Sequence, residues 1–163
     1  MRGRIDQQQN MWFTMRSEDF VPKGHPLREI KKIADAELKR LAPVFNKAYA
    51  KTGRSSVPPE RLIKATLLQA LFSIRSERQL CEQIHYNLLF RWFLDLKPDD
   101  EVFAPTTFTK NRERFAKHGF MEKFFNGTVA QAICEDAVSQ EHFSVDGTLI
   151  QSWASMKSFR PKD

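Results

Sequence analysis

Cysteine and glycine are scarce in this sequence, and long apolar runs are missing. The two cysteines, Cys81 and Cys134, are too few for a disulfide framework, which excludes small disulfide-stabilised secreted domains and favours a reducing compartment. The 6 glycines form no glycine-rich phosphate-binding loop. The densest apolar run, residues 62–72, contains Lys64 and Gln69 and is too short to span a membrane. The charged N-terminus leads into no apolar stretch, so a signal peptide is not expected.

A sizeable apolar fraction and an excess of positive charge are what the sequence does contain. Its 163 residues suit one domain, or one domain and the beginning of another, and 41% of them are hydrophobic. The 14 phenylalanines predict a core rich in aromatic rings. The formal net charge of +6 and the pI of about 9.5 favour an acidic partner, either nucleic acid or an anionic membrane surface. The alternative is a basic soluble protein with no such partner.

Hydrophobic periodicity predicts helices over most of the chain, after an N-terminal arm of residues 1–24. Apolar residues spaced by three and four predict a helix over residues 25–49, and Pro43 predicts a kink or a break within it. Residues 51–60, rich in Ser, Pro and Gly, read as a loop. Further helices are expected at residues 60–74, 76–87, 88–96, 108–119 and 120–138.

Local signals predict where some of these helices begin and end. Ser76, with Gln79 three residues later, forms a capping-box pattern at a helix start. Thr106 or Thr107 can cap the helix that follows, and Gly119 is expected to end it.

After Ser139 the spacing of apolar residues changes from helical to alternating. Phe143 and Val145 alternate with polar neighbours, which predicts a strand within residues 141–150. A strand needs a partner for its backbone groups, so it reads as the first piece of a domain whose remainder is missing. The expected fold class is therefore mainly α: a helical bundle over residues 25–138, weakened at Gly127, and then one β-strand in residues 139–163.

Basic side chains gather in two parts of the predicted helical region. The first group lies on three short helices between residues 60 and 96, and the second follows on the next helix: Arg61, Lys64, Arg75, Arg78 and Arg91, then Lys110, Arg112 and Arg114. Arginines on short helices can hold phosphates and contact bases, which indicates a helix-turn-helix-like DNA-binding region. The turn also places two arginines around a helix N-terminus, which favours a phosphate. The alternative is a solvated helix face with salt bridges to Glu77 and Glu82.

Three other patterns have ordinary explanations beside the functional ones. Cys81 and His85 are four residues apart and could share a metal ion, but no second pair completes a zinc site. Four aromatic residues that could stack on bases are more typical of a hydrophobic core: Tyr86, Phe90, Trp92 and Phe93. Asp146 at the strand end could bind a metal ion, yet Asp-Gly is also the commonest hairpin turn.

Three blocks of sequence occur in an order that identifies a family. They are SIRSERQL at residues 73–80, NLLFRWF at 87–93 and FSVDGTLI at 143–150. Over residues 11–163 the chain resembles bacterial insertion-sequence transposases with an InsH-like N-terminal domain, which are DDE transposases. Two positions depart from that pattern, because proline is expected where Ser55 stands and glycine where Asp95 stands.

The resemblance implies a helical region that binds double-stranded DNA at the terminal inverted repeats of the element, followed by a catalytic domain similar to ribonuclease H. It implies that Asp146 is the first catalytic aspartate and a ligand of Mg²⁺, shared with two later carboxylates that have no counterpart here. Cleavage by these 163 residues alone is therefore not expected.

The resemblance also bears on partners and location. A DNA-associated protein of the bacterial cytoplasm is expected, with no membrane partner, that can pair with itself or with intact transposase. One alternative is a non-catalytic DNA-binding module that regulates transposition. A structural oligomerisation fragment built on the Phe-rich helices is a third possibility, and it needs no DNA.

Overall fold

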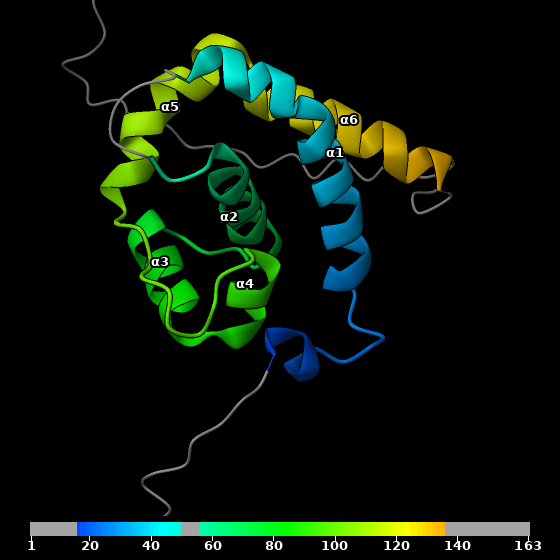
Figure 1. Ribbon diagram of the computed structural model, residues 1–163, viewed down its shortest axis with the longest axis vertical. Coiled ribbons are helices and arrows are strands. Elements are labelled where there is room, and N and C mark those ends of the chain that lie inside the picture. Colours follow the sequence, from blue (N-terminus) through cyan, green and yellow to red (C-terminus); the bar gives the residue numbers. More distant parts are fainter. Residues whose placement is uncertain (1–15, 50–55, 136–163) are drawn as a thin grey trace, which may run out of the picture.

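The computed structural model describes residues 16–49 and 56–135, and this part of the chain is mainly helical, as predicted (Figure 1). In chain order the elements are η1 Ser17–Phe20, α1 Leu27–Ala48, α2 Pro59–Leu71, α3 Glu77–Tyr86, α4 Leu88–Phe93, α5 Thr106–His118 and α6 Phe120–Cys134. No strand occurs within the described ranges. The predicted strand and Asp146 lie outside them, so that part of the fold prediction stays a prediction.

Several helix ends follow the local chemistry of the sequence. The side chain of Ser76 caps α3 by accepting a hydrogen bond from the Gln79 backbone N–H at 3.2 Å, as expected. Gly119 ends α5 with a left-handed backbone, φ +60°, which costs glycine little because it has no Cβ. The prediction of a threonine cap on α5 is wrong. Pro105 stands at the cap position with no side-chain hydrogen bond, and Thr106 is already helical.

Helix α1 runs through Pro43 without a break, and its axis turns along its length (Figure 1). Proline has no N–H to donate, and its ring pushes against the carbonyl of the preceding turn, so a bend is the expected response. The helix continues because Leu41 and Phe45, on either side of the proline, are both buried.

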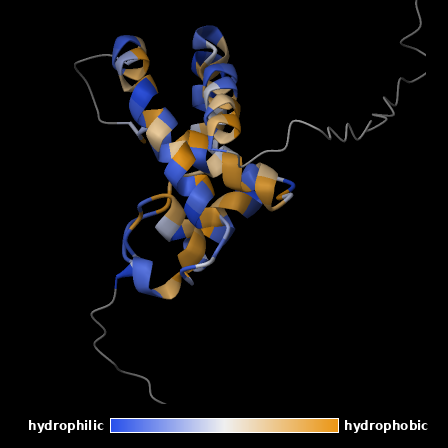
Figure 2. Cartoon of the chain, turned by 90° about the vertical axis from the view of Figure 1, so that its right-hand side faces the viewer, coloured by the Kyte–Doolittle hydropathy of each residue, from blue (hydrophilic) through white to orange (hydrophobic). Residues whose placement is uncertain are grey.

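The core consists of two hydrophobic clusters that α2 connects. The first contains buried residues of α2, α3 and α4, such as Leu62, Ile84 and Phe93. The second joins α1 to α6 around Phe45 and Phe120, whose ring centroids lie 4.9 Å apart in an edge-to-face contact. Hydrophobic and hydrophilic residues alternate along the helices, as expected for helices that each bury one side (Figure 2).

The N-terminal segment contributes to the first cluster. Val21 is buried there, and η1 packs against α4. Glu18 of η1 accepts hydrogen bonds from the Arg28 guanidinium and the Trp92 indole. These hydrogen bonds lower the pKa of the Glu18 carboxyl below its ordinary value, Arg28 having the larger effect.

Gly127 allows α1 and α6 to approach closely. A Cβ atom at this position would overlap the carboxylate of Glu37, which is 4% exposed. That carboxylate accepts hydrogen bonds from Arg40 Nε at 2.8 Å and from an Arg40 terminal nitrogen at 2.6 Å. The glycine, which lowers helix propensity, therefore makes room for the buried Glu37 carboxylate of α1, whose ion pair is with Arg40 of the same helix.

Candidate nucleic-acid interface

Arg91 is buried, and its hydrogen bonds join the end of α3 to the loop of residues 97–100. Its side chain is 2% exposed, although the sequence places it among the DNA-binding candidates. Its guanidinium donates to the carbonyl oxygens of Ile84 and His85, at the end of α3, at 3.2 and 3.3 Å. It also donates twice to the Lys97 carbonyl, at 3.0 and 2.8 Å, and once to that of Asp100. The structure therefore does not place Arg91 on an exposed basic face.

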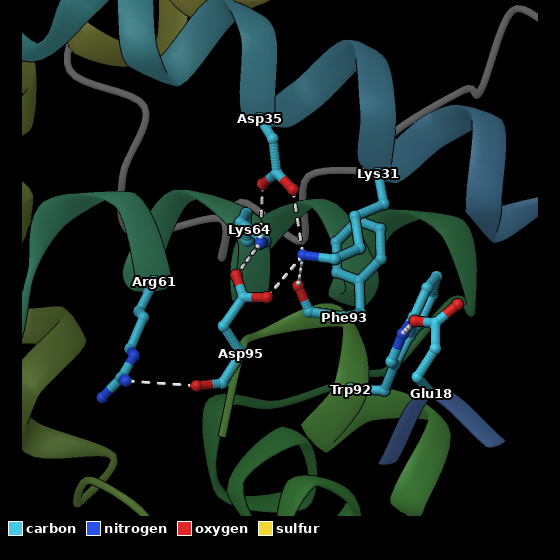
Figure 3. A network of polar contacts seen from close by, with 8 residues as sticks. All are labelled: Glu18, Lys31, Asp35, Arg61, Lys64, Trp92, Phe93 and Asp95. Carbon is cyan, nitrogen blue, oxygen red and sulfur yellow. Dashed lines mark hydrogen bonds and ion pairs between the residues drawn. The ribbon is translucent and has the colours of Figure 1, made fainter. Parts of the chain in front are cut away.

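Lys64 is also buried, inside a ring of four charges (Figure 3). Its ammonium lies 2.7 Å from an Asp35 oxygen and 2.6 Å from an Asp95 oxygen. Lys31 contacts the other oxygen of each carboxylate, at 2.9 and 2.7 Å. The ring joins α1 and α2 to Asp95, which lies just after α4. Its two positive and two negative charges cancel.

The charges in this ring perturb one another. Desolvation, reinforced by the neighbouring Lys31 ammonium, outweighs the hydrogen bonds to the two carboxylates and lowers the pKa of Lys64. For Lys31, desolvation also acts to lower the pKa, but the hydrogen bonds to Asp95 and Asp35 outweigh it and the pKa is raised. Desolvation acts to raise the pKa of Asp95, and the hydrogen bonds from Lys31 and Lys64 outweigh it, so that pKa lies below its ordinary value.

Two more of the predicted DNA-binding residues are engaged within the protein. Arg61 is half-buried and donates to the Asp95 carbonyl at 3.2 Å (Figure 3). Arg114 is half-buried, donates to the Asn111 side chain at 3.2 Å and places its guanidinium 4.4 Å from the centre of the Tyr49 ring. Both side chains keep partial access to water.

The remaining candidates are exposed, and three of them meet at the start of α3. Arg75 precedes the Ser76 cap of α3 and Arg78 lies in its first turn, and neither has an ion pair within the described residues. Arg112 reaches across from α5 to form an ion pair with Glu77, while its side chain stays 69% exposed. Lys110 is exposed on α5, about 160° around the helix from Arg112. The predicted α5 cluster is therefore divided, and only Arg112 joins the two α3 arginines.

Comparison with known proteins gives one match. The sequence profile of the transposase domain family (DUF772) matches residues 15–114, more than half of the chain. The chain belongs to this transposase domain family. No curated protein and no solved structure matches the chain significantly. The matched region includes the ring of charges and the basic start of α3, and membership indicates a role in transposition.

Other parts of the transposase domain bear on the remaining sequence predictions. Within residues 16–49 and 56–135 no group of three or more His, Cys, Asp or Glu side chains is placed to hold a metal ion. Cys81 is buried, and burial raises the pKa of its thiol to about 11. No helix in those ranges is long and apolar enough to cross a membrane. The core interpretation is confirmed for Phe90, Trp92 and Phe93, whereas Tyr86 is 76% exposed.

Sequence reasoning missed the partners of the buried cations. Asp95 stands out in the sequence only because glycine is expected there, and its left-handed backbone, φ +54°, is the reason that glycine suits this position. Lys64 and Arg91 each interrupt an apolar run. A cation in such a run indicates a buried charge that has a partner. This pattern therefore predicts that Lys64 and Arg91 are both buried.

Proposed function

We propose that this transposase domain binds duplex DNA at the ends of its element through the α3 basic surface, which we define as Arg75, Arg78 and Arg112. The observation that carries the proposal is the exposure of three guanidinium groups around one helix start, two of them without an ion pair among the described residues. Arginine forks suit phosphate oxygens, and the net charge of +6 attracts a polyanion.

The α2–α3 pair supports a helix-turn-helix-like role for this surface. The two helices contact each other and are separated by the turn of residues 72–76, in which Ser73 has φ +50°. In the helix-turn-helix arrangement, the second helix enters the major groove and the first crosses the backbone. In this proposal α3 enters the groove, and Arg75, Arg78 and Arg112 contact the phosphates on either side.

Replacing Arg75 and Arg78 together by alanine is expected to weaken DNA binding and its dependence on salt. Each lost phosphate contact reduces the log–log slope of affinity against salt by about 0.9, so the slope of the double variant becomes shallower by about 2. Fluorescence anisotropy with a terminal-repeat duplex, between about 50 and about 200 mM salt, measures both quantities.

The matched control is Lys39→Ala with Lys47→Ala, which removes the same charge from exposed positions on α1. This control is expected to keep most of the affinity and the slope. Equal losses in the two double variants would indicate net charge rather than a defined surface. No binding by the wild-type chain at low salt would refute the proposal.

The catalytic part of the proposal rests on the resemblance to DDE transposases. Asp146, which lies outside the described residues, is proposed as the first Mg²⁺ ligand of a ribonuclease H-like centre. Mg²⁺ prefers carboxylate oxygens, and two-metal strand cleavage requires further carboxylates beside this one. In a transposase that carries the complete centre, Asp146→Ala is expected to abolish Mg²⁺-dependent cleavage of the element ends. Cleavage that survives this substitution would remove Asp146 from the mechanism.

A further inference from the structure

The side of α3 that faces away from the core carries polar side chains that no other part of the described structure uses. Gln79, Glu82, Gln83 and Tyr86 follow one another at the spacing i, i+3, i+4, i+7, and all are exposed. The opposite side holds the buried residues Leu80, Cys81 and Ile84. Four side chains at this spacing share one stripe of the helix, which we call the α3 polar face.

None of the four side chains has a hydrogen bond or an ion pair within residues 16–49 and 56–135. Glu82 comes one turn after Arg78, yet no ion pair joins them. Tyr86 is 76% exposed, and its ring makes an edge contact with that of His85, at 4.7 Å between centroids. No hydrogen bond or ion pair from the described part of the chain therefore occupies these side chains, and they can contact another molecule.

The chemistry of the face differs from that of the α3 basic surface beside it. Two amides and one carboxylate carry no positive charge to attract phosphates, and the carboxylate repels them. The same groups match base edges in the major groove: glutamine pairs with adenine, and a carboxylate accepts from the cytosine amino group. An exposed aromatic ring can contact a thymine methyl group. The ten residues of α3 span about 15 Å, enough to follow several base pairs.

We infer that the α3 polar face reads the DNA sequence, with Gln79, Glu82 and Gln83 contacting base edges while Arg75 and Arg78 contact phosphates. This inference rests on the proposed DNA binding and adds to it the residues that determine specificity. Glu82 has a second effect, because a carboxylate in the groove disfavours every sequence that does not present a donor to it.

The test selects binding sites for the wild-type chain from random-sequence duplexes, then measures the affinity ratio between the best selected duplex and its scrambled version. Gln79→Ala and Gln83→Ala are each expected to lower this ratio by about 5- to 150-fold, the usual range for one bidentate base contact. The salt slope is expected to stay unchanged, because no phosphate contact is lost. Glu82→Ala is expected to raise the affinity for the scrambled duplex and so to lower the ratio as well.

Matched controls come from α6. Gln131→Ala and Glu122→Ala make the same chemical changes outside the α3 polar face and are expected to leave the ratio unchanged. All five variants lie at half-exposed or exposed positions, and circular dichroism verifies that each is folded. If the three α3 variants keep the wild-type ratio while binding remains salt-dependent, the inference is wrong and the proposed function stands. If the wild-type chain binds no duplex, both are wrong.

Discussion

Replacing Arg91 by methionine is expected to destabilise the protein strongly. Methionine fills a similar volume but leaves four buried or half-buried carbonyl oxygens without their donor. An orphaned buried acceptor costs about 1–3 kcal/mol, and water reaches some of these oxygens, so the expected loss in the free energy of unfolding is about 4 kcal/mol. Urea unfolding followed by circular dichroism measures this loss.

Arg91→Lys separates the geometry of the guanidinium from its charge. Lysine keeps the positive charge, but its ammonium cannot donate to the end of α3 and to the 97–100 loop at the same time. We expect a loss close to that of methionine. Where these variants remain folded, their affinity for DNA is expected to equal that of wild type, because the side chain is buried. A variant with wild-type stability and no DNA binding would contradict the structural role.

In the ring of charges, removing the acids is expected to cost far more than removing the buried lysine. Asp35→Asn with Asp95→Asn leaves the Lys64 ammonium, whose side chain is 3% exposed, without a carboxylate. Stranding a buried charge typically costs about 3–5 kcal/mol. Asparagine at position 95 also tolerates the left-handed backbone, so the comparison isolates the charge.

Lys64→Met is the matched variant, and its expected cost is within about 1 kcal/mol. The side chains of Asp35 and Asp95 are 43% and 63% exposed, so water solvates the two carboxylates once the lysine is gone. Lys31 also remains to pair with them. Urea unfolding measures the free energy of unfolding of both variants. A Lys64→Met variant as unstable as the double asparagine variant would contradict this account.

The same ring predicts a dependence of stability on pH. Because the folded pKa of Asp95 is lowered, its contribution is fully present above the unfolded value of about 3.9 and is lost as pH falls through the folded pKa. Unfolding curves collected from about pH 6 down to about pH 2 are expected to show this loss in wild type and not in Asp95→Asn. Parallel curves for the two proteins would show that the carboxylate contributes nothing.

The helices could be predicted from the sequence because their signals are local. The spacing of apolar residues, the serine cap of α3 and the glycine at the end of α5 each act within a few residues of the chain. Pro43 predicts a kink or a break, and the helix continues because residues on both sides of the proline are buried, which local spacing does not reveal.

The candidate site was predicted less well, because a basic residue type does not specify where its side chain points. Arg75 and Arg78 are exposed, as a DNA-binding role requires. Lys64 instead binds carboxylates that are distant in sequence, and Arg91 binds backbone carbonyls 6 to 9 residues away. Asp95 lies 31 residues from Lys64, and only the packing of α2 and α4 in the first core cluster brings them together. Long-range partners of this kind do not leave a periodic pattern.

The left-handed backbone at Asp95 also constrains the order in which this sequence can change over evolution. Glycine fits that backbone better than aspartate, so the substitution is locally favourable, but it deletes one of the two carboxylates that Lys64 needs. Once Asp35 is lost as well, the chain passes through a state with a buried, unpaired cation. A lineage that first replaces Lys64 by an apolar residue avoids that state. At least one acid at positions 35 and 95 is therefore expected to accompany lysine at 64, and the second acid is expected to disappear only after that lysine.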